Sequence, residues 1–247
     1  IILFTFYVFI WYTYFVMSTL NERILNMDIN KLLSIPKSLY FNLSAFPLKT
    51  AIKMPVLVSY KTKLKGIKKN KVIIDAPIKF GLIRIGFGGI DAIMENNCSF
   101  FRIDDTGKVI FKGKCLFSSG VSLRISNDST LTFGDNFSTN KNFTIFCDDI
   151  TTIGNDVLVG WNVNIRSSDG HHIYDTVNKL NNPIVKPVTI GNHVWIASNV
   201  DILKGSEIAD DCIIAYRSCV LSKFTTPNCI IGGYPAKILR ENVNWQY

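Results

Sequence analysis

A step of six residues between apolar positions is the feature that most constrains the fold of this chain. From Ile153 onward the step is kept by two sets of residues: Ile153, Val159, Ile165, and then Ile190, Ile196, Ile202, Ile208, Ile214, Val220. An α-helix repeats its apolar face every three or four residues, and a half-buried strand alternates every two. A step of six therefore predicts a solenoid, in which one short strand and one corner occupy each six residues.

Three such steps make one turn of a triangular prism, so residues three steps apart should stack on one face. The three predicted stacks are Ile153 with Ile190 and Ile208, Val159 with Ile196 and Ile214, and Ile165 with Ile202 and Val220. Each coil buries its apolar side only against its neighbours, so the repeats stabilise one another. Small residues after several of these positions, such as Gly154, Gly191 and Ala215, suit tight corners.

The period is looser upstream, where the step of six gives way to alternation at Leu123 and Ile125, Leu131 and Phe133, and Phe143 and Ile145. We interpret this part as the same solenoid with irregular coils. The predicted organisation is an apolar N-terminal extension (1–26), an N-terminal cap with a short helix (27–70), a β-helix (71–234), and a C-terminal helix and tail (235–247). Pro235 suits the first position of that last helix.

Ile1–Leu20 carries no charged residue and is long enough to span a bilayer. The chain begins with Ile, and no positive segment precedes the apolar run as in a signal peptide. Met17 and Met27 are alternative starts, so we expect residues 1–26 to be an over-extended start, with a membrane anchor as the other interpretation.

The formal net charge of +8 is concentrated in one lysine-rich stretch: Lys53, Lys61, Lys63, Lys65, Lys68, Lys69, Lys71. Such a stretch is either a solvated face or a surface that attracts an anionic partner, such as membrane lipid or an acidic glycan. No nucleic-acid-binding motif accompanies it, so no nucleic acid partner is expected. The six cysteines show no CxxC pair and no metal-ligand spacing, which predicts buried thiols in a reducing compartment and no bound metal.

One break interrupts the period, because Ile165 and Ile190 are 25 residues apart. A segment of about 169–187 must therefore leave the prism, and it contains His171 and His172, two of the three histidines. A neutral histidine can take a proton from a hydroxyl, provided that a partner such as Asp169, Asp175 or a backbone carbonyl fixes its tautomer. The excursion is thus the candidate active-site loop.

The segments Ser167–Asp175, Ile190–Ala197 and Gly232–Lys237 resemble the hexapeptide-repeat acetyltransferases. The nearest groups are the galactoside/maltose acetyltransferases and the polysaccharide O-acetyltransferases of capsule and lipopolysaccharide clusters. The resemblance is strong from about Gly134 to Arg240, weaker over 27–133 and absent before Met27. It implies an all-β, left-handed parallel β-helix; the hand is not given by the spacing, because parallel crossovers are otherwise nearly always right-handed.

The resemblance also implies which residues meet the acceptor. The Gly-His step of the family falls on Gly170 and His171, so His171 is expected to be the general base. Asn142 takes the position of an acceptor-binding asparagine one coil earlier. Asp148 and Asp169 are further candidates for substrate binding.

The donor implied by the resemblance is acetyl-CoA, held in a groove between subunits of a homotrimer. The expected donor-binding residues are Trp195, Ala197, Ser198, Ala215, Lys223, Lys237 and Arg240, with the three basic side chains meeting phosphates. Tyr216 and Arg217 stand where the family usually has small residues, so they either narrow the groove or add contacts.

The predicted function is acetyl-CoA-dependent O-acetylation of a sugar or polysaccharide hydroxyl, in the cytoplasm or at the inner face of the membrane, with peripheral membrane association. N-acylation of a nucleotide-linked amino sugar is the alternative within the same fold. A carbonic anhydrase-like metal site would need three histidine ligands, and only His171, His172 and His193 exist. The remaining hypothesis is a structural β-helix without catalytic activity, which coenzyme A binding would eliminate.

Overall fold

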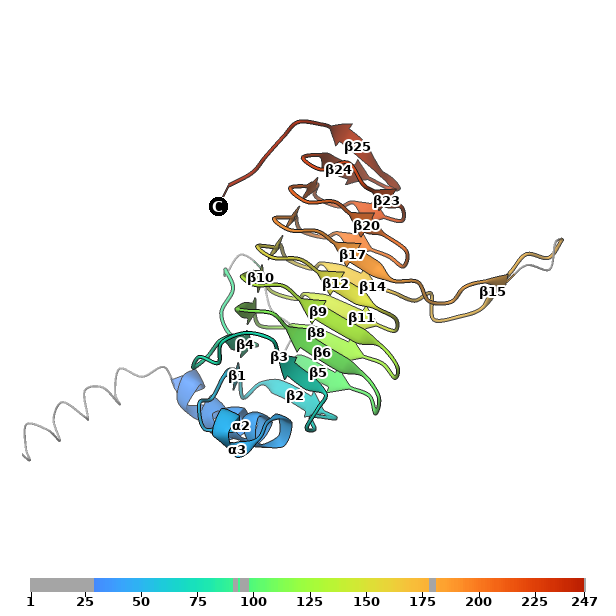
Figure 1. Ribbon diagram of the computed structural model, residues 1–247. Helices are drawn as coiled ribbons and strands as arrows, with labels where there is room; N and C mark the ends of the chain where they lie inside the picture. Colours follow the sequence, from blue (N-terminus) through green and yellow to red (C-terminus); the bar gives the residue numbers. More distant parts are fainter. Residues whose placement is uncertain (1–28, 91–92, 94–97, 178–180, 247) are drawn as a thin grey trace, which may run out of the picture.

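The computed structural model describes residues 29–90, 93, 98–177 and 181–246, so the predicted extension 1–26 lies outside the described residues. Figure 1 shows a stack of coils with two helices, α2 and α3, at one end and the strands β24 and β25 at the other. Among the residues described, no helix combines the length and the apolar character needed to cross a bilayer.

Three parallel sheets form the faces of the prism, and each coil contributes one strand to each sheet. Sheet A contains β1 (Val56–Val58), β4 (Ile83–Ile85), β7 (Cys115–Phe117), β10 (Phe137–Thr139), β13 (Leu158–Val159), β18 (Trp195–Ile196), β21 (Ile213–Ile214), β24 (Ile230–Gly233) and, antiparallel at its end, β25 (Ala236–Arg240).

Sheet B contains β2 (Thr62–Lys65), β5 (Ser99–Ile103), β8 (Ser122–Ile125), β11 (Thr144–Cys147), β14 (Asn164–Arg166), β19 (Asp201–Ile202) and β22 (Cys219–Val220). Sheet C contains β3 (Val72–Ile74), β6 (Lys108–Phe111), β9 (Thr130–Phe133), β12 (Thr151–Ile153), β17 (Val188–Ile190), β20 (Glu207–Ile208) and β23 (Lys223–Phe224). The chain passes from A to B to C in every coil, so we name the edges the A–B, B–C and C–A corners.

The three predicted stacks are confirmed by the strand registers. Ile153 pairs with Ile190, and Ile190 with Ile208, in sheet C. The stacks of Val159, Ile196 and Ile214 in sheet A, and of Ile165, Ile202 and Val220 in sheet B, are equally in register. All of these side chains are at most 1% exposed, so each coil completes its core only by contact with the next.

The corners explain the small and amide residues of the repeats. A Cβ on Gly154 would lie 2.5 Å from the backbone of Gly191 in the next coil, so only glycine fits there. On the A–B corner Asn142, Asn162 and Asn199 adopt left-handed backbone conformations, with φ of 63°, 55° and 59°. Their amides form a ladder, from Asn142 to Asn162 and from Asn162 to Asn199, each bond 3.1 Å long. Asparagine suits this position because it tolerates the left-handed region and can bond locally.

The first strand of sheet A is protected by polar side chains of a helix. On α2 (Ile29–Ala45), Ser38 Oγ accepts a hydrogen bond from Val58 N at 2.8 Å, and Asn42 Nδ2 donates to Val56 O at 2.6 Å. These contacts satisfy backbone groups that an edge strand otherwise exposes to pairing. The short α3 (Leu48–Ala51) follows directly.

The strands begin earlier than the sequence indicated. β1 and β2 lie within the segment expected to be only a cap (27–70), and they already pair with β4 and β5 of the next coil. The short helix expected within the cap is present as α2, and Pro36 lies within it on an exposed turn, where water can reach the carbonyl that loses its partner.

The prediction of a C-terminal helix after Pro235 is wrong. Residues Ala236–Arg240 form β25, which reverses direction after Gly233 and pairs with β24, with Gly233 opposite Ala236. Gly233 has a φ of 106°, a conformation that permits the reversal. The free edge of β24 needs hydrogen-bond partners at the end of the stack, and the backbone of β25 supplies them.

Candidate functional site

The excursion, residues 169–187, leaves the prism at the B–C corner after Ser167. Ser167 N donates to Phe146 O at 3.2 Å and Lys186 N donates to Ser167 O at 3.0 Å, so the two ends are held together at the prism. Between them, β15 (Ile173–Tyr174) and β16 (Asn181–Asn182) pair antiparallel. Figure 1 shows the excursion projecting far from the stack of coils, as the break in the period predicted.

Both histidines of the excursion are exposed. The His172 ring stacks on Tyr174, with centroids 6.0 Å apart and planes at 20°. Of the two carboxylates expected to orient His171, Asp169 forms an ion pair with Lys204 of the next B–C corner, and Asp175 Oδ1 accepts a hydrogen bond from Val177 N at 2.8 Å. Asp169 thus anchors the start of the excursion to the prism.

An apolar cavity of about 730 Å³ lies on the outer face of sheet A, on the other side of the prism. It brings together four of the seven predicted donor-binding residues: Trp195, Ala197, Ser198 and Ala215. The remaining lining comes mainly from stacked strand and corner positions: Asn140, Leu158, Gly160, Trp161, Ile213, Tyr216, Trp245 and Gln246. We call this the sheet A cavity.

Two tryptophans of the sheet A cavity were missed by sequence reasoning. Trp245 is only 7% exposed; its ring stacks on His193 at 4.4 Å and its Nε1 donates to His193 O at 2.9 Å. His193 Nδ1 is in turn 2.8 Å from Asp211 Oδ1. Trp161 stands at a corner where the neighbouring coils carry Ser198 and Tyr216. A large aromatic in a polar tail, and another in a corner, were the available signals.

The three basic residues predicted to bind the phosphates of the donor lie on two different faces of the prism. Lys237 and Arg240 are exposed on β25, on the same sheet as the cavity and beyond β21 and β24. Lys223 lies on β23 of sheet C, where its Nζ is 2.9 Å from Glu207 Oε2. Within one chain, Lys223 is therefore not brought to the sheet A cavity.

The predicted acceptor residues divide in the same way. Asn142 is part of the amide ladder on the A–B corner, which also carries Asn140 of the cavity. Asp148 lies on the B–C corner at the base of the excursion, where its N–H donates to Ser167 Oγ at 2.8 Å and its carboxylate accepts a hydrogen bond from Ser126. The predicted site residues therefore fall into two groups, which we call the half-sites. One is Asn142 with the sheet A cavity, and the other is Asp148 and Asp169 with His171.

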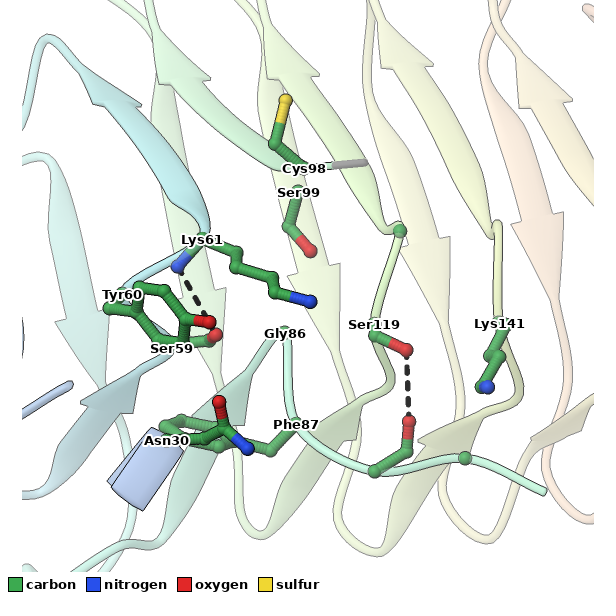
Figure 2. Close-up of a pocket in the computed structure, with 13 residues that line it drawn as sticks. Asn30, Ser59, Tyr60, Lys61, Gly86, Phe87, Cys98, Ser99, Ser119 and Lys141 are labelled. Carbon is green, nitrogen blue, oxygen red and sulfur yellow. Dashed lines mark hydrogen bonds between the residues drawn. The ribbon is translucent and has the colours of Figure 1, made fainter. Parts of the chain in front are cut away.

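Figure 2 shows a second pocket on the A–B corner, in the first coils, with a volume of about 340 Å³. Its lining is rich in hydroxyl and amino groups, from Ser59, Lys61, Ser99, Ser119 and Lys141. Ser119 Oγ donates to Gly88 O at 3.1 Å, which ties the glycine-rich segment 86–89 of the pocket lining to the next coil. Ile90 links it to the sheet A cavity, because Ile90 N donates to Asn140 Oδ1 at 3.3 Å and Ile90 O accepts from Trp161 Nε1 at 3.4 Å.

The cysteines of the core are poorly suited to nucleophilic catalysis. Burial raises the pKa of Cys147 to about 11 and also raises the pKa of Cys115. A thiol with such a pKa stays protonated near neutral pH, and the thiolate is the nucleophilic form. Within the described ranges, no group of three or more histidine, cysteine or acidic side chains could hold a metal ion, and His193 lies on a different corner from His171.

Comparison with known proteins agrees with this architecture. Residues 187–222 match the family model of the bacterial transferase hexapeptide (six repeats). The galactoside O-acetyltransferase of Escherichia coli K12 is 38% identical over 116 residues, 47% of this chain and 56% of that protein. The polysialic acid O-acetyltransferase of Escherichia coli O1:K1 is 31% identical over 59% of this chain and 44% of that protein. An uncharacterized 24.8 kDa protein of the cps region of Klebsiella pneumoniae is 30% identical over 79% of this chain and 83% of that protein.

The three-sheet coil, the six-residue repeat and the family-model match over residues 187–222 define a hexapeptide-repeat protein. This chain belongs to the bacterial hexapeptide-repeat transferase family. The chain spans about half the length of the two named acetyltransferases that it matches.

Proposed function

We propose that the protein is an acetyl-CoA-dependent O-acetyltransferase that acts on a sugar or polysaccharide hydroxyl. The observation that carries this proposal is the sheet A cavity, which gathers Trp195, Ala197, Ser198 and Ala215 from two consecutive coils. Small side chains at Ala197 and Ala215 let the extended arm of coenzyme A lie close to the protein backbone. The tryptophans that line the cavity suit the apolar part of that arm. The relatives named above carry O-acetyltransferase activities on galactosides and polysialic acid.

His171 acts in this proposal as the general base. Its neutral imidazole takes the proton of the acceptor hydroxyl as the hydroxyl oxygen attacks the thioester carbonyl. The carbon–sulfur bond then breaks, and the proton passes to the leaving thiolate of coenzyme A. The exposed position of His171 supports this role, because the acceptor must reach it.

We infer a homotrimer, and the separation of the two half-sites supports it. The excursion starts at the B–C corner, which is opposite sheet A in a triangular prism, so His171 and the sheet A cavity of one chain do not face each other. A neighbouring copy that inserts its excursion beside this cavity completes the site, and a cyclic trimer closes such head-to-tail contacts. We further infer that the coils are left-handed, as the family resemblance implies.

The second pocket is our candidate for the acceptor. Its hydroxyl and amino groups suit a polyhydroxylated ligand, and it continues the A–B corner from the sheet A cavity. N-acylation of an amino sugar remains the alternative reaction, since the same base and donor would serve an amine. We propose the cytoplasm as the compartment in which this transfer takes place.

The test is thioester consumption with acetyl-CoA and a panel of acceptors. Neutral oligosaccharides, acidic oligosaccharides and amino-sugar nucleotides should be assayed separately, with the acetylated product identified by mass and by its sensitivity to mild alkali, which cleaves esters and spares amides. Alkali-labile acetylation of a saccharide supports the proposal. Acetylation of the amine alone would replace the O-acetyltransferase proposal with N-acylation of an amino sugar.

A further inference from the structure

The outer face of the two N-terminal helices is apolar. Nine large apolar side chains between residues 29 and 52 are each at least 40% exposed: Ile29, Leu32, Leu33, Ile35, Leu39, Tyr40, Leu43, Leu48 and Ile52. They lie on α2, on α3 and just after it, at one end of the prism. A concentration of exposed apolar side chains of this kind on a folded protein marks an interaction site.

The helix α2 is turned the opposite way from an ordinary surface helix. A surface helix normally places its apolar stripe against the core. Three of the five buried residues of α2 are polar, namely Ser34, Ser38 and Asn42, and they are committed to hydrogen bonds that include β1. The apolar residues are left outside, so core packing does not account for them.

The charge around this face has a single sign. Residues 29–74 contain ten lysines and no aspartate or glutamate. Lys31, Lys49 and Lys53 are exposed on or directly after the same helices. Lys37 is the exception, because its Nζ turns inward and donates to Tyr60 O at 2.5 Å and Thr62 O at 2.7 Å. An apolar face flanked by lysines complements a surface that offers both hydrocarbon and negative charge.

We propose that the outer face of α2 and α3 docks on an anionic lipid bilayer. The leucine and isoleucine side chains enter the boundary between headgroups and acyl chains, while Lys31, Lys49 and Lys53 contact anionic headgroups. The opposite end of the prism, with β24 and β25, then points away from the lipid. This docking surface is separate from the sheet A cavity and from the excursion, so it does not depend on the proposed acyl transfer.

The test is flotation of the full chain with lipid vesicles, without donor or acceptor. One vesicle is pure phosphatidylcholine and the other contains about a quarter phosphatidylglycerol. We expect binding to the anionic vesicle, reduced at about 0.5 M NaCl, because salt screens the lysine contacts. Leu39→Gln with Leu43→Gln should lower the partition coefficient at least about tenfold, since it removes two apolar insertions.

Two further pairs of substitutions sharpen the result. Lys49→Gln with Lys53→Gln should lower binding to the anionic vesicle by roughly tenfold or more, because each lysine near such a surface contributes about fivefold. Ile150→Gln with Leu221→Gln is the matched control, since these side chains are 57% and 50% exposed on the prism itself, and it should bind as wild type does. Circular dichroism of every variant confirms that the coils are folded.

Three outcomes would overturn the proposal. Undiminished vesicle binding by the Leu39→Gln, Leu43→Gln protein would place the membrane contact elsewhere. Equal binding to both vesicles would remove the role of the lysines. If no vesicle is bound and the same pair instead lowers the molar mass measured by light scattering, a second copy of the chain covers the face.

Discussion

The excursion and the sheet A cavity are built in opposite ways. The excursion is an exposed hairpin held to the prism at its base, where Asp169 meets Lys204. The cavity lies on strands whose inward side chains, such as Ile196 and Ile214, are fully buried. Sites on packed strands keep their geometry, whereas loops bring adaptable chemical groups. We therefore expect the proposed donor-binding cavity and the proposed general base to meet only when a second prism is present.

The largest effect is expected from loss of the proposed general base, His171. His171→Ala should lower kcat by roughly two to four decades, the usual range for a lost general base, while the Kd for coenzyme A stays close to wild type. Steady-state kinetics and calorimetry measure the two quantities separately. His172→Ala is the matched control and should lose far less, because His172 stacks on Tyr174. Wild-type turnover in His171→Ala would remove the excursion from the chemistry.

Filling the cavity should have the next largest effect. Ile213 lies on the outer face of β21 beside Trp195, so Ile213→Trp occupies the sheet A cavity without entering the core. We expect the Kd for coenzyme A to rise by about a hundredfold, since a blocked pocket forfeits part of the binding free energy of its ligand. Thr189→Trp, on the outer face of β17 in sheet C, makes the same change elsewhere and should bind normally. Equal affinity in both variants would place the donor outside the cavity.

A smaller loss should follow removal of the tail tryptophan. Trp245→Ala deletes a wall of the sheet A cavity and its stacking on His193. The KM for acetyl-CoA should rise about tenfold, the order expected for one aromatic contact with its buried area, and the KM for the acceptor should not change. Trp245→Phe keeps the ring and should recover most of the affinity. A change confined to the acceptor KM would contradict the assignment.

The smallest effect should come from the anchor of the excursion. Asp169→Asn weakens the ion pair with Lys204, a pair that is partly exposed. Exposed pairs contribute about 0.2–1 kcal/mol, so we expect a decrease in kcat of a few-fold with donor affinity unchanged. Lys204→Met should have the same effect, and the double variant should be no worse than either single one. Additive losses would show that the two residues act independently.

The regular coils could be predicted from the sequence because every six-residue step repeats one pattern, with a buried corner residue such as Val194 and a buried strand residue such as Ile196. Ile196 and Ile214 are 18 residues apart in register, which is three steps of six. The earlier coils are wider: Cys115 pairs with Phe137, 22 residues later. Their four-residue strands bury two side chains each, as with Leu131 and Phe133 on β9, so alternation replaces the step of six. The loss of phase upstream was thus a change of strand length within the same fold.

The parts that sequence did not predict depend on contacts between distant segments. The helix expected after Pro235 is a strand because the last edge of sheet A needed a partner. The position of Trp245 in the cavity depends on a tail that returns to His193, 52 residues earlier in the chain. By contrast, the sequence predicted that Trp195, Ala197, Ser198 and Ala215 lie together, and the structure places them in one cavity because Ala197 and Ala215 occupy equivalent positions in neighbouring coils.

If two chains supply the two half-sites, mixing the His171→Ala and Ile213→Trp variants should restore activity at an acetyl-CoA concentration too low for Ile213→Trp to bind. His171→Ala keeps an intact cavity, and Ile213→Trp keeps an intact base. After joint unfolding and refolding at equal amounts, about a quarter of the sites in randomly mixed trimers should pair an intact cavity with an intact neighbouring base. We therefore expect about a quarter of wild-type activity from the mixture. Activity no greater than the sum of the two separate variants would contradict the account.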